Sequence, residues 1–134
     1  MTTTSIVLLQ FKPEASSEDI KEVCSRMLSL KDRCLHPDTQ KPYIQSYNGG
    51  VDNSIEGMQV RTRPWTTYVP IDGRNTNGVE HQKNGFTHAF VIQFQSTEDR
   101  DYCVNADTVH QDIVGSLDRI VEKAQVVDFT HGVF

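Results

Sequence analysis

The sequence has no excess of positive charge and no long hydrophobic run. Its 134 residues include 13 Lys and Arg against 18 Asp and Glu, which gives a formal net charge of −5 at pH 7. The scattered basic residues offer no surface for a nucleic acid backbone or an anionic membrane. The first five residues carry no basic run and the apolar stretch after them is short, so neither a signal peptide nor a membrane span is expected. We therefore expect a soluble cytoplasmic protein without nucleic acid or membrane partners.

Several motifs of catalysis are also missing. The chain has no Gly-x-Gly-x-x-Gly or phosphate-binding loop, and no Gly-x-Ser-x-Gly turn for a nucleophilic serine. Its five histidines are not at metal-ligand spacing, so we predict neither a metal nor another cofactor. Cysteine is scarce, and Cys24, Cys34 and Cys103 form no Cys-x-x-Cys pair. We interpret all three as buried free thiols.

The patterns that are present predict one domain over residues 1–134. Apolar alternation indicates strands, apolar stripes at three- and four-residue steps indicate helices, and serines before acidic residues mark helix starts. In chain order, we expect a strand at 6–11, a helix from Ser16 or Ser17 to about Arg33, a strand at 43–47, a strand at 88–94, a short helix after Ser96, a helix with its apolar stripe over 113–124, and a strand at 125–129. Gly49-Gly50 is expected to turn the chain after the second strand.

This order of elements predicts an α+β fold. Two split β-α-β halves form a ferredoxin-like βαββαβ subunit, an antiparallel sheet with helices on one face. The other face would carry Val91, Ala89 and Leu8, an apolar patch that a soluble monomer would leave uncovered. Packing two such sheets together gives a closed, two-fold symmetric dimeric α/β barrel, so we expect a homodimer.

One long segment, Val60 to Gln82, shows neither the period of a strand nor that of a helix. It can be a loop insertion with a binding or lid role carried by Arg63, Trp65 and Tyr68, or a solvated excursion. It can also be a translated, retained intron, because its deletion would join the flanking residues cleanly. A comparison of the gene with a spliced transcript separates these explanations.

Four stretches carry a resemblance to a known family: residues 6–13, 84–91, 94–102 and 126–129, with Gly-Phe-Thr-His at 85–88 followed downstream by Val109-His110. They resemble the stress-responsive dimeric α/β-barrel family, and the loop at 52–57 is similar to that of its fungal members. The resemblance spans nearly the whole chain outside the long segment. It implies the dimeric barrel described above. It also implies one of two kinds of function, since some members are described only by stress induction and a plant member is a cofactor-independent polyketide cyclase.

The chemistry of such a cyclase, an intramolecular aldol condensation, needs a base, a proton donor and a dry pocket. His110 is the candidate base, because imidazole titrates near neutral pH and His110 lies just before an apolar helix. It also resembles the essential histidine of the family cyclase. Tyr102 is the candidate donor. An alignment without a gap puts Cys103 in the tyrosine position instead, and Ser5 stands where the cyclase has histidine.

His88 shares the face of Phe90, which should point toward the helices, so it either enters a pocket or is a buried histidine bonded within the core. The expected lining of a substrate pocket is apolar and comprises Val7, Leu9, Val23, Met27, Phe90 and Ile92. We therefore expect a small-molecule pocket protein for an apolar or polyketide-like ligand, as a cyclase or lyase of secondary metabolism. The alternative is a non-catalytic stress-response or interaction protein. Convergence of His88, Tyr102 and His110 on a cavity of roughly 300 Å³ would favour the enzyme.

Overall fold

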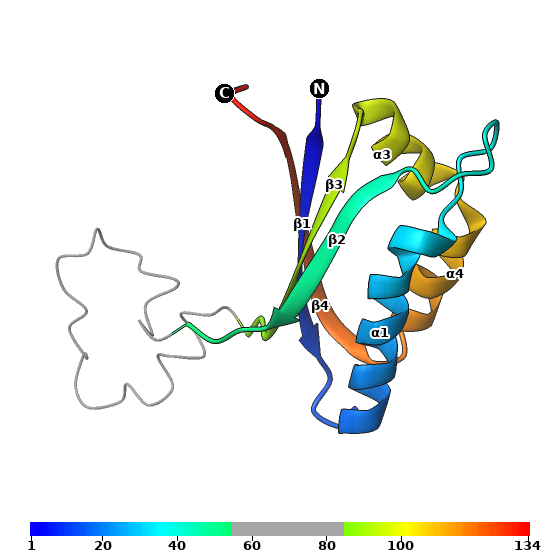
Figure 1. The fold of residues 1–134 in the computed structure, drawn as a ribbon. Coiled ribbons are helices and arrows are strands. Elements are labelled where there is room, and N and C mark those ends of the chain that lie inside the picture. The colour runs from blue at the N-terminus through cyan, green and yellow to red at the C-terminus, as the bar shows by residue number, and fades with distance from the viewer. Residues whose placement is uncertain (55–84) are drawn as a thin grey trace, which may run out of the picture.

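The structure is a computed structural model that describes residues 1–54 and 85–134. The segment from Val60 to Gln82, with its three alternative interpretations, lies outside these residues. The described part forms a sheet with helices on one side (Figure 1). Its elements are β1 Thr3–Phe11, α1 Ser17–Arg33, β2 Ile44–Val51, β3 His88–Phe94, α3 Thr97–Asn105, α4 Thr108–Leu117 and β4 Val121–Thr130.

The four strands are antiparallel and lie in the order β2-β3-β1-β4. The two strands that enclose each helical connection are therefore not consecutive in the sheet, as in a ferredoxin-like fold. Figure 1 shows α1, α3 and α4 on the same face of this sheet. The predicted α+β, ferredoxin-like fold with helices on one face is confirmed.

Serine caps start the first two helices, as the sequence predicts. The Ser16 side chain accepts a hydrogen bond from the backbone N–H of Asp19, and Ser96 accepts one from Asp99 in the same way. Each contact satisfies one of the amides that a helix start leaves free. Below its cap, α1 buries the predicted stripe of Val23, Met27 and Leu30.

The prediction that Gly49-Gly50 turns the chain is wrong, because both glycines lie inside β2 and pair with Phe90 and Ala89. The reason is steric. A Cβ on Gly49 would overlap the Phe90 ring and would lie 2.9 Å from the Ala89 carbonyl oxygen. Glycine at position 49 therefore leaves room for the Phe90 ring on the neighbouring strand. The glycine is needed for packing within the sheet and not for a turn.

The prediction of one apolar helical stripe over 113–124 is also wrong beyond Leu117. α4 ends there, and Val121 and Ala124 belong to β4, which pairs with β1 from Val121 onward. A run of apolar residues at three- and four-residue steps cannot distinguish a helix from a helix followed by a strand. Backbone pairing with β1 decides the outcome.

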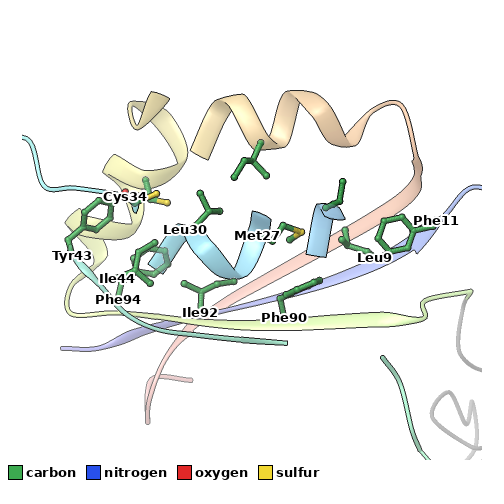
Figure 2. Close-up of a cluster of buried hydrophobic side chains, with 13 residues drawn as sticks. Leu9, Phe11, Met27, Leu30, Cys34, Tyr43, Ile44, Phe90, Ile92 and Phe94 are labelled. Atoms are coloured by element: carbon green, nitrogen blue, oxygen red, sulfur yellow. The ribbon is translucent and has the colours of Figure 1, made fainter. Parts of the chain in front are cut away.

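The hydrophobic core fills the space between the sheet and the helices. Figure 2 shows Leu9, Phe90 and Ile92 on the strands below Met27 and Leu30 of α1. Phe90, Leu9 and Leu30 are each 1% exposed, so this layer excludes water. Burial of such side chains contributes about 1.5–3 kcal/mol each relative to leaving them exposed.

The opposite face of the sheet is apolar and has no helix over it in the described part of the chain (Figure 1). Strand register puts Ile6, Val91 and Val127 in one row across three strands, and Leu8 beside Ala89 in the next. Val91 is 37% exposed and Val127 is 50% exposed. We call residues Ile6, Leu8, Ala89, Val91, Val127 and Phe129 the outer face.

Candidate functional site

His110 lies in the first turn of α4, and its imidazole is largely withdrawn from solvent. Its Nδ1 atom is buried and has no hydrogen-bond partner among the residues that the structure describes. Burial lowers the pKa of His110, and the negative charge of Asp107 acts in the opposite direction. The imidazole is therefore neutral at pH 7 and carries a ring nitrogen that is not committed to a bond within the described protein.

Asp107 precedes His110 and caps α4. Its Oδ1 accepts hydrogen bonds from the backbone N–H of Val109, at 2.9 Å, and of His110, at 3.4 Å. Its Oδ2 accepts a hydrogen bond of 2.6 Å from the Tyr43 hydroxyl. Burial, together with this bond, raises the pKa of Tyr43, so the phenol stays protonated and donates.

The helical repeat places His110 away from α1. Arg26 of α1 contacts Asp112 and Ser116, so that side of α4 faces α1. His110 lies roughly 120° or more around the helix from both of them, because successive residues are about 100° apart. It therefore lies on a side of α4 other than the one that faces α1.

The inward side of β4 is only partly covered. Val126 shares a register row with Val7 and Phe90, so it points toward the helix layer, yet it is 58% exposed. Asp128 points the same way, beside Ser5, and its Oδ2 accepts a hydrogen bond of 2.8 Å from Arg100 of α3. On the helix side of the sheet, β4 thus exposes apolar surface at Val126 beside the ion pair of Asp128 and Arg100.

Tyr102 lies on α3, near the start of α4. Its ring packs edge-on against Tyr43, with centroids 5.5 Å apart, and lies 6.4 Å from the ring of His36. The Tyr102 carbonyl accepts the backbone N–H of Asp107. Tyr102 and His110 are therefore brought to the same end of the domain, with Asp107 between them in sequence and in space.

His88 lies at the other end of β3. Phe94 is six residue steps further along the strand, a span of roughly 20 Å. The sheet register puts Phe94 beside Ile44, the neighbour of Tyr43, so the Tyr43–Tyr102 contact belongs to the far end of the strand. The structure therefore separates His88 from the pair of Tyr102 and His110.

The His88 side chain faces the helices, as predicted, and its ring meets that of Phe11 edge-on with centroids 4.8 Å apart. Burial lowers the pKa of His88. It lines an apolar pocket of about 130 Å³ between α1, β2 and β3. The pocket is lined by Ile20, Lys21, Cys24, Leu28, Gly49, Gly50, Val51, His88 and Phe90.

Of the six residues expected to line a substrate pocket, five lie in the buried core and Val7 packs against it. Phe90 also borders the pocket beside His88. Between that pocket and Tyr102, the core is filled by side chains such as Ile92, which is 5% exposed. The chain thus offers two separate polar positions, one at His88 and one at His110.

The cysteines are free thiols, as predicted. Cys34 and Cys103 are buried, but Cys24 is only partly buried, so the prediction that all three are buried is wrong for Cys24. A hydrogen bond with Cys103, burial and the charge of Asp107 raise the pKa of Cys34. Among residues 1–54 and 85–134, no group of three His, Cys, Asp or Glu side chains could hold a metal ion. No helix in this part of the chain is long and apolar enough to cross a membrane.

The sequence analysis missed the contact between Tyr43 and Asp107. Asp107 could have been recognised as a cap, because an aspartate stands directly before the helix that carries His110. Tyr43 carries no local signal, since it meets Asp107 across 64 residues of sequence. A bond of this kind depends on how the elements pack and has no periodic pattern.

The model of the family described as "Stress responsive A/B Barrel Domain" matches residues 72–131. No curated protein matches the chain at a significant level. Several solved structures share its fold. A hydroxynitrile lyase from Passiflora edulis is 17% identical with a TM-score of 0.68, and the match covers 99% of this chain and 96% of that one.

A protein from Arabidopsis thaliana is 21% identical with a TM-score of 0.65, covering 98% of this chain and 97% of that one. A dimeric ferredoxin-like protein of unknown function from Thermobifida fusca is 13% identical with a TM-score of 0.58, covering 97% and 91%. At such identities the likeness establishes the fold and leaves activity open.

Proposed function

We propose that the chain is a member of the stress responsive A/B barrel family that forms a homodimer and acts on a small, largely apolar molecule at His110. Family membership is supported by the model match over 72–131 together with the shared fold. A cytoplasmic location and a fungal type of member belong to the same proposal. So does distant similarity to a plant polyketide cyclase, olivetolic acid cyclase.

The dimer would form through the outer face. Val91 and Val127 are exposed in the middle of this face, and covering them removes apolar surface from water. The Thermobifida fusca protein with the same fold is described as dimeric. Two copies packed by this face would leave the helix side of each subunit, which carries His110, outside the dimer interface.

The reaction would be a cofactor-independent cyclisation or lyase step. His110 would take a proton from a carbon between two carbonyl groups. The resulting enolate would attack a second carbonyl carbon of the same chain, a C–C bond would form, and the carbonyl oxygen would take up a proton. Tyr102 is the proposed donor for that oxygen, since it lies at the same end of the domain as His110.

The observation that carries this proposal is the buried Nδ1 of His110, which has no hydrogen-bond partner in the described part of the chain. A buried polar atom usually has a partner, because leaving it unpaired costs about 1–3 kcal/mol. A substrate group would supply the missing partner. The neutral state that burial favours is also the state that a general base requires.

His88 is the second proposed site residue, and its separation from His110 suggests a different task. Its pocket of about 130 Å³ is close to the size of a cavity that holds one benzene ring. We propose that this pocket, with Phe90, takes an apolar end of a ligand. The core beneath this pocket would be formed by the other predicted lining residues, Val7, Leu9, Val23, Met27 and Ile92.

A non-catalytic role is the second candidate, and the filled core between His88 and Tyr102 favours it. In that case the dimer is the functional unit. The two candidates are separated by offering linear poly-β-ketones to the protein and following cyclised product. Conversion that depends on His110 supports the enzyme. Absence of conversion across chain lengths, with an intact dimer, supports the non-catalytic role.

A further inference from the structure

We infer that Asp107 is a positioning residue for His110 and that Tyr43 holds Asp107 in place. The Asp107 carboxylate fixes the start of α4 and places a negative charge near the His110 imidazole. The inference rests on the proposed role of His110. It adds two residues to that site, Asp107 and Tyr43, which are 64 positions apart in the sequence.

The Asp107 carboxylate is buried and both of its oxygens are occupied. It is 3% exposed, and Oδ2 accepts from Tyr43 while Oδ1 accepts from the first turn of α4. A buried carboxylate is costly unless it is fully hydrogen-bonded. Its bonds here run to the turn that carries His110, so the position of the carboxylate and that of His110 are coupled.

A helix cap alone does not need such a group. In the same chain, Ser16 and Ser96 cap α1 and α3 with a neutral hydroxyl. Serine, asparagine and aspartate are about equally effective as caps. By contrast, α4, which carries His110, is capped by the buried carboxylate of Asp107, and the Tyr43 hydroxyl donates a hydrogen bond to that carboxylate. The charge therefore has a role beyond capping.

Tyr43 holds this charge in one place. It is 8% exposed and stands directly before β2, so its hydroxyl joins the start of a strand to the start of α4. The Tyr102 ring packs against its other side. Loss of the hydroxyl would leave Oδ2 buried with one donor fewer, which loosens the cap at the turn of His110.

Two other acidic groups near α4 are paired with arginines. Asp112 forms an ion pair with Arg26 of α1, at 3.8 Å, and Asp128 of β4 bonds Arg100 of α3. Asp107 is the charge that raises the pKa of His110 against the effect of burial. Removal of that charge should therefore make the imidazole harder to protonate.

The decisive variant is Asp107→Asn. Asparagine keeps a cap acceptor for the α4 amides and a polar group opposite Tyr43, but it carries no charge. We expect the titration midpoint of His110, followed by NMR of its imidazole protons, to move to lower pH by about one unit. Asp107→Ser is a second neutral variant, and the shift of the His110 midpoint can be measured in whichever of the two variants folds. An unchanged midpoint in a folded variant would overturn the inference and leave Asp107 as a cap only.

Tyr43→Phe tests the other half of the inference. We expect the backbone amides of Val109 and His110 to exchange with solvent about tenfold faster, since one bond to Asp107 is lost. Tyr47→Phe is the matched control, because Tyr47 packs against Phe90 rather than Asp107. Equal exchange rates in both variants would show that Tyr43 does not hold Asp107 in place.

These measurements use no substrate, so their outcome is independent of turnover. A shifted titration with no activity toward any poly-β-ketone would end the proposed function and keep the coupling of Asp107 to His110. Activity together with an unshifted titration would keep the proposed function and end this inference.

Discussion

The Phe90 ring lies in the space that a side chain at position 49 would need. A Cβ on Gly49 would stand 2.7 Å from Cε1 of that ring, well inside van der Waals contact. Phe90 is 1% exposed and central to the core, so it cannot move aside into solvent (Figure 2). The glycine on β2 and the ring on β3 are therefore one packing unit.

Gly49→Ala should destabilise the fold by about 1–3 kcal/mol, because the ring and the Ala89 carbonyl must both give way. Denaturant unfolding measures this change. Gly115→Ala is the control with the opposite sign. That glycine is exposed in α4 with nothing near its missing Cβ, so alanine should stabilise the fold by about 0.5–1 kcal/mol. Equal effects of the two variants on stability would contradict the claim that the Phe90 ring needs glycine at position 49.

The dimer proposal is tested at Val91. Sedimentation at micromolar concentration should give twice the 15.2 kDa chain mass. Val91→Asp should dissociate the dimer, since a charge in the middle of a buried sheet face is left unpaired, at a cost of several kcal/mol. Val104→Asp, on the exposed surface of α3, should leave the mass unchanged. A monomeric wild-type chain would rule out the homodimer.

Stability should fall in mildly acidic solution because of the buried imidazoles. Burial lowers the pKa of both His88 and His110 in the folded state, whereas the unfolded chain titrates near 6.5. Below that pH the unfolded chain binds more protons, so stability is lost as pH falls through about 6.5 toward the folded pKa. His110→Gln should lose less stability between pH 8 and pH 5.5 than the wild type. The exposed His131→Gln control should follow the wild type.

Local patterns were sufficient for the architecture. Alternation in 88–94 located β3 and its inward face, and serines before acidic residues located two helix starts. These signals depend only on a few neighbouring residues, which is why they can be read without the fold. The end of α4 and the role of Gly49 depend on pairing with β1 and on a ring from another strand. No local pattern records such contacts.

The candidate site was predicted less completely for the same reason. His88, Tyr102 and His110 are each suited to proton chemistry, but residue type does not say how far apart they lie. β3 separates His88 from Tyr102 by its own length, roughly 20 Å. The Tyr43 bond to Asp107 joins residues 64 positions apart and follows from the packing of β2 against the helices. The sequence could predict which residues are suited to proton chemistry, but only the structure shows which of them lie close together.

The proposed base assignment is tested by His110→Ala in the presence of a linear poly-β-ketone that the wild type converts. Turnover should fall by about 10²- to 10⁴-fold, the usual contribution of a positioned general base, with the dimer and fold unchanged. Tyr102→Phe should cost less, because water can replace a donor more easily than a base. His88→Ala is the discriminating control, since His88 lies in a separate pocket and should raise KM more than it lowers kcat. If His110→Ala retains full activity and His88→Ala abolishes it, the base lies on β3 instead. If neither change affects turnover, the reaction does not use either imidazole, and the likeness to the lyase of Passiflora edulis is one of fold alone.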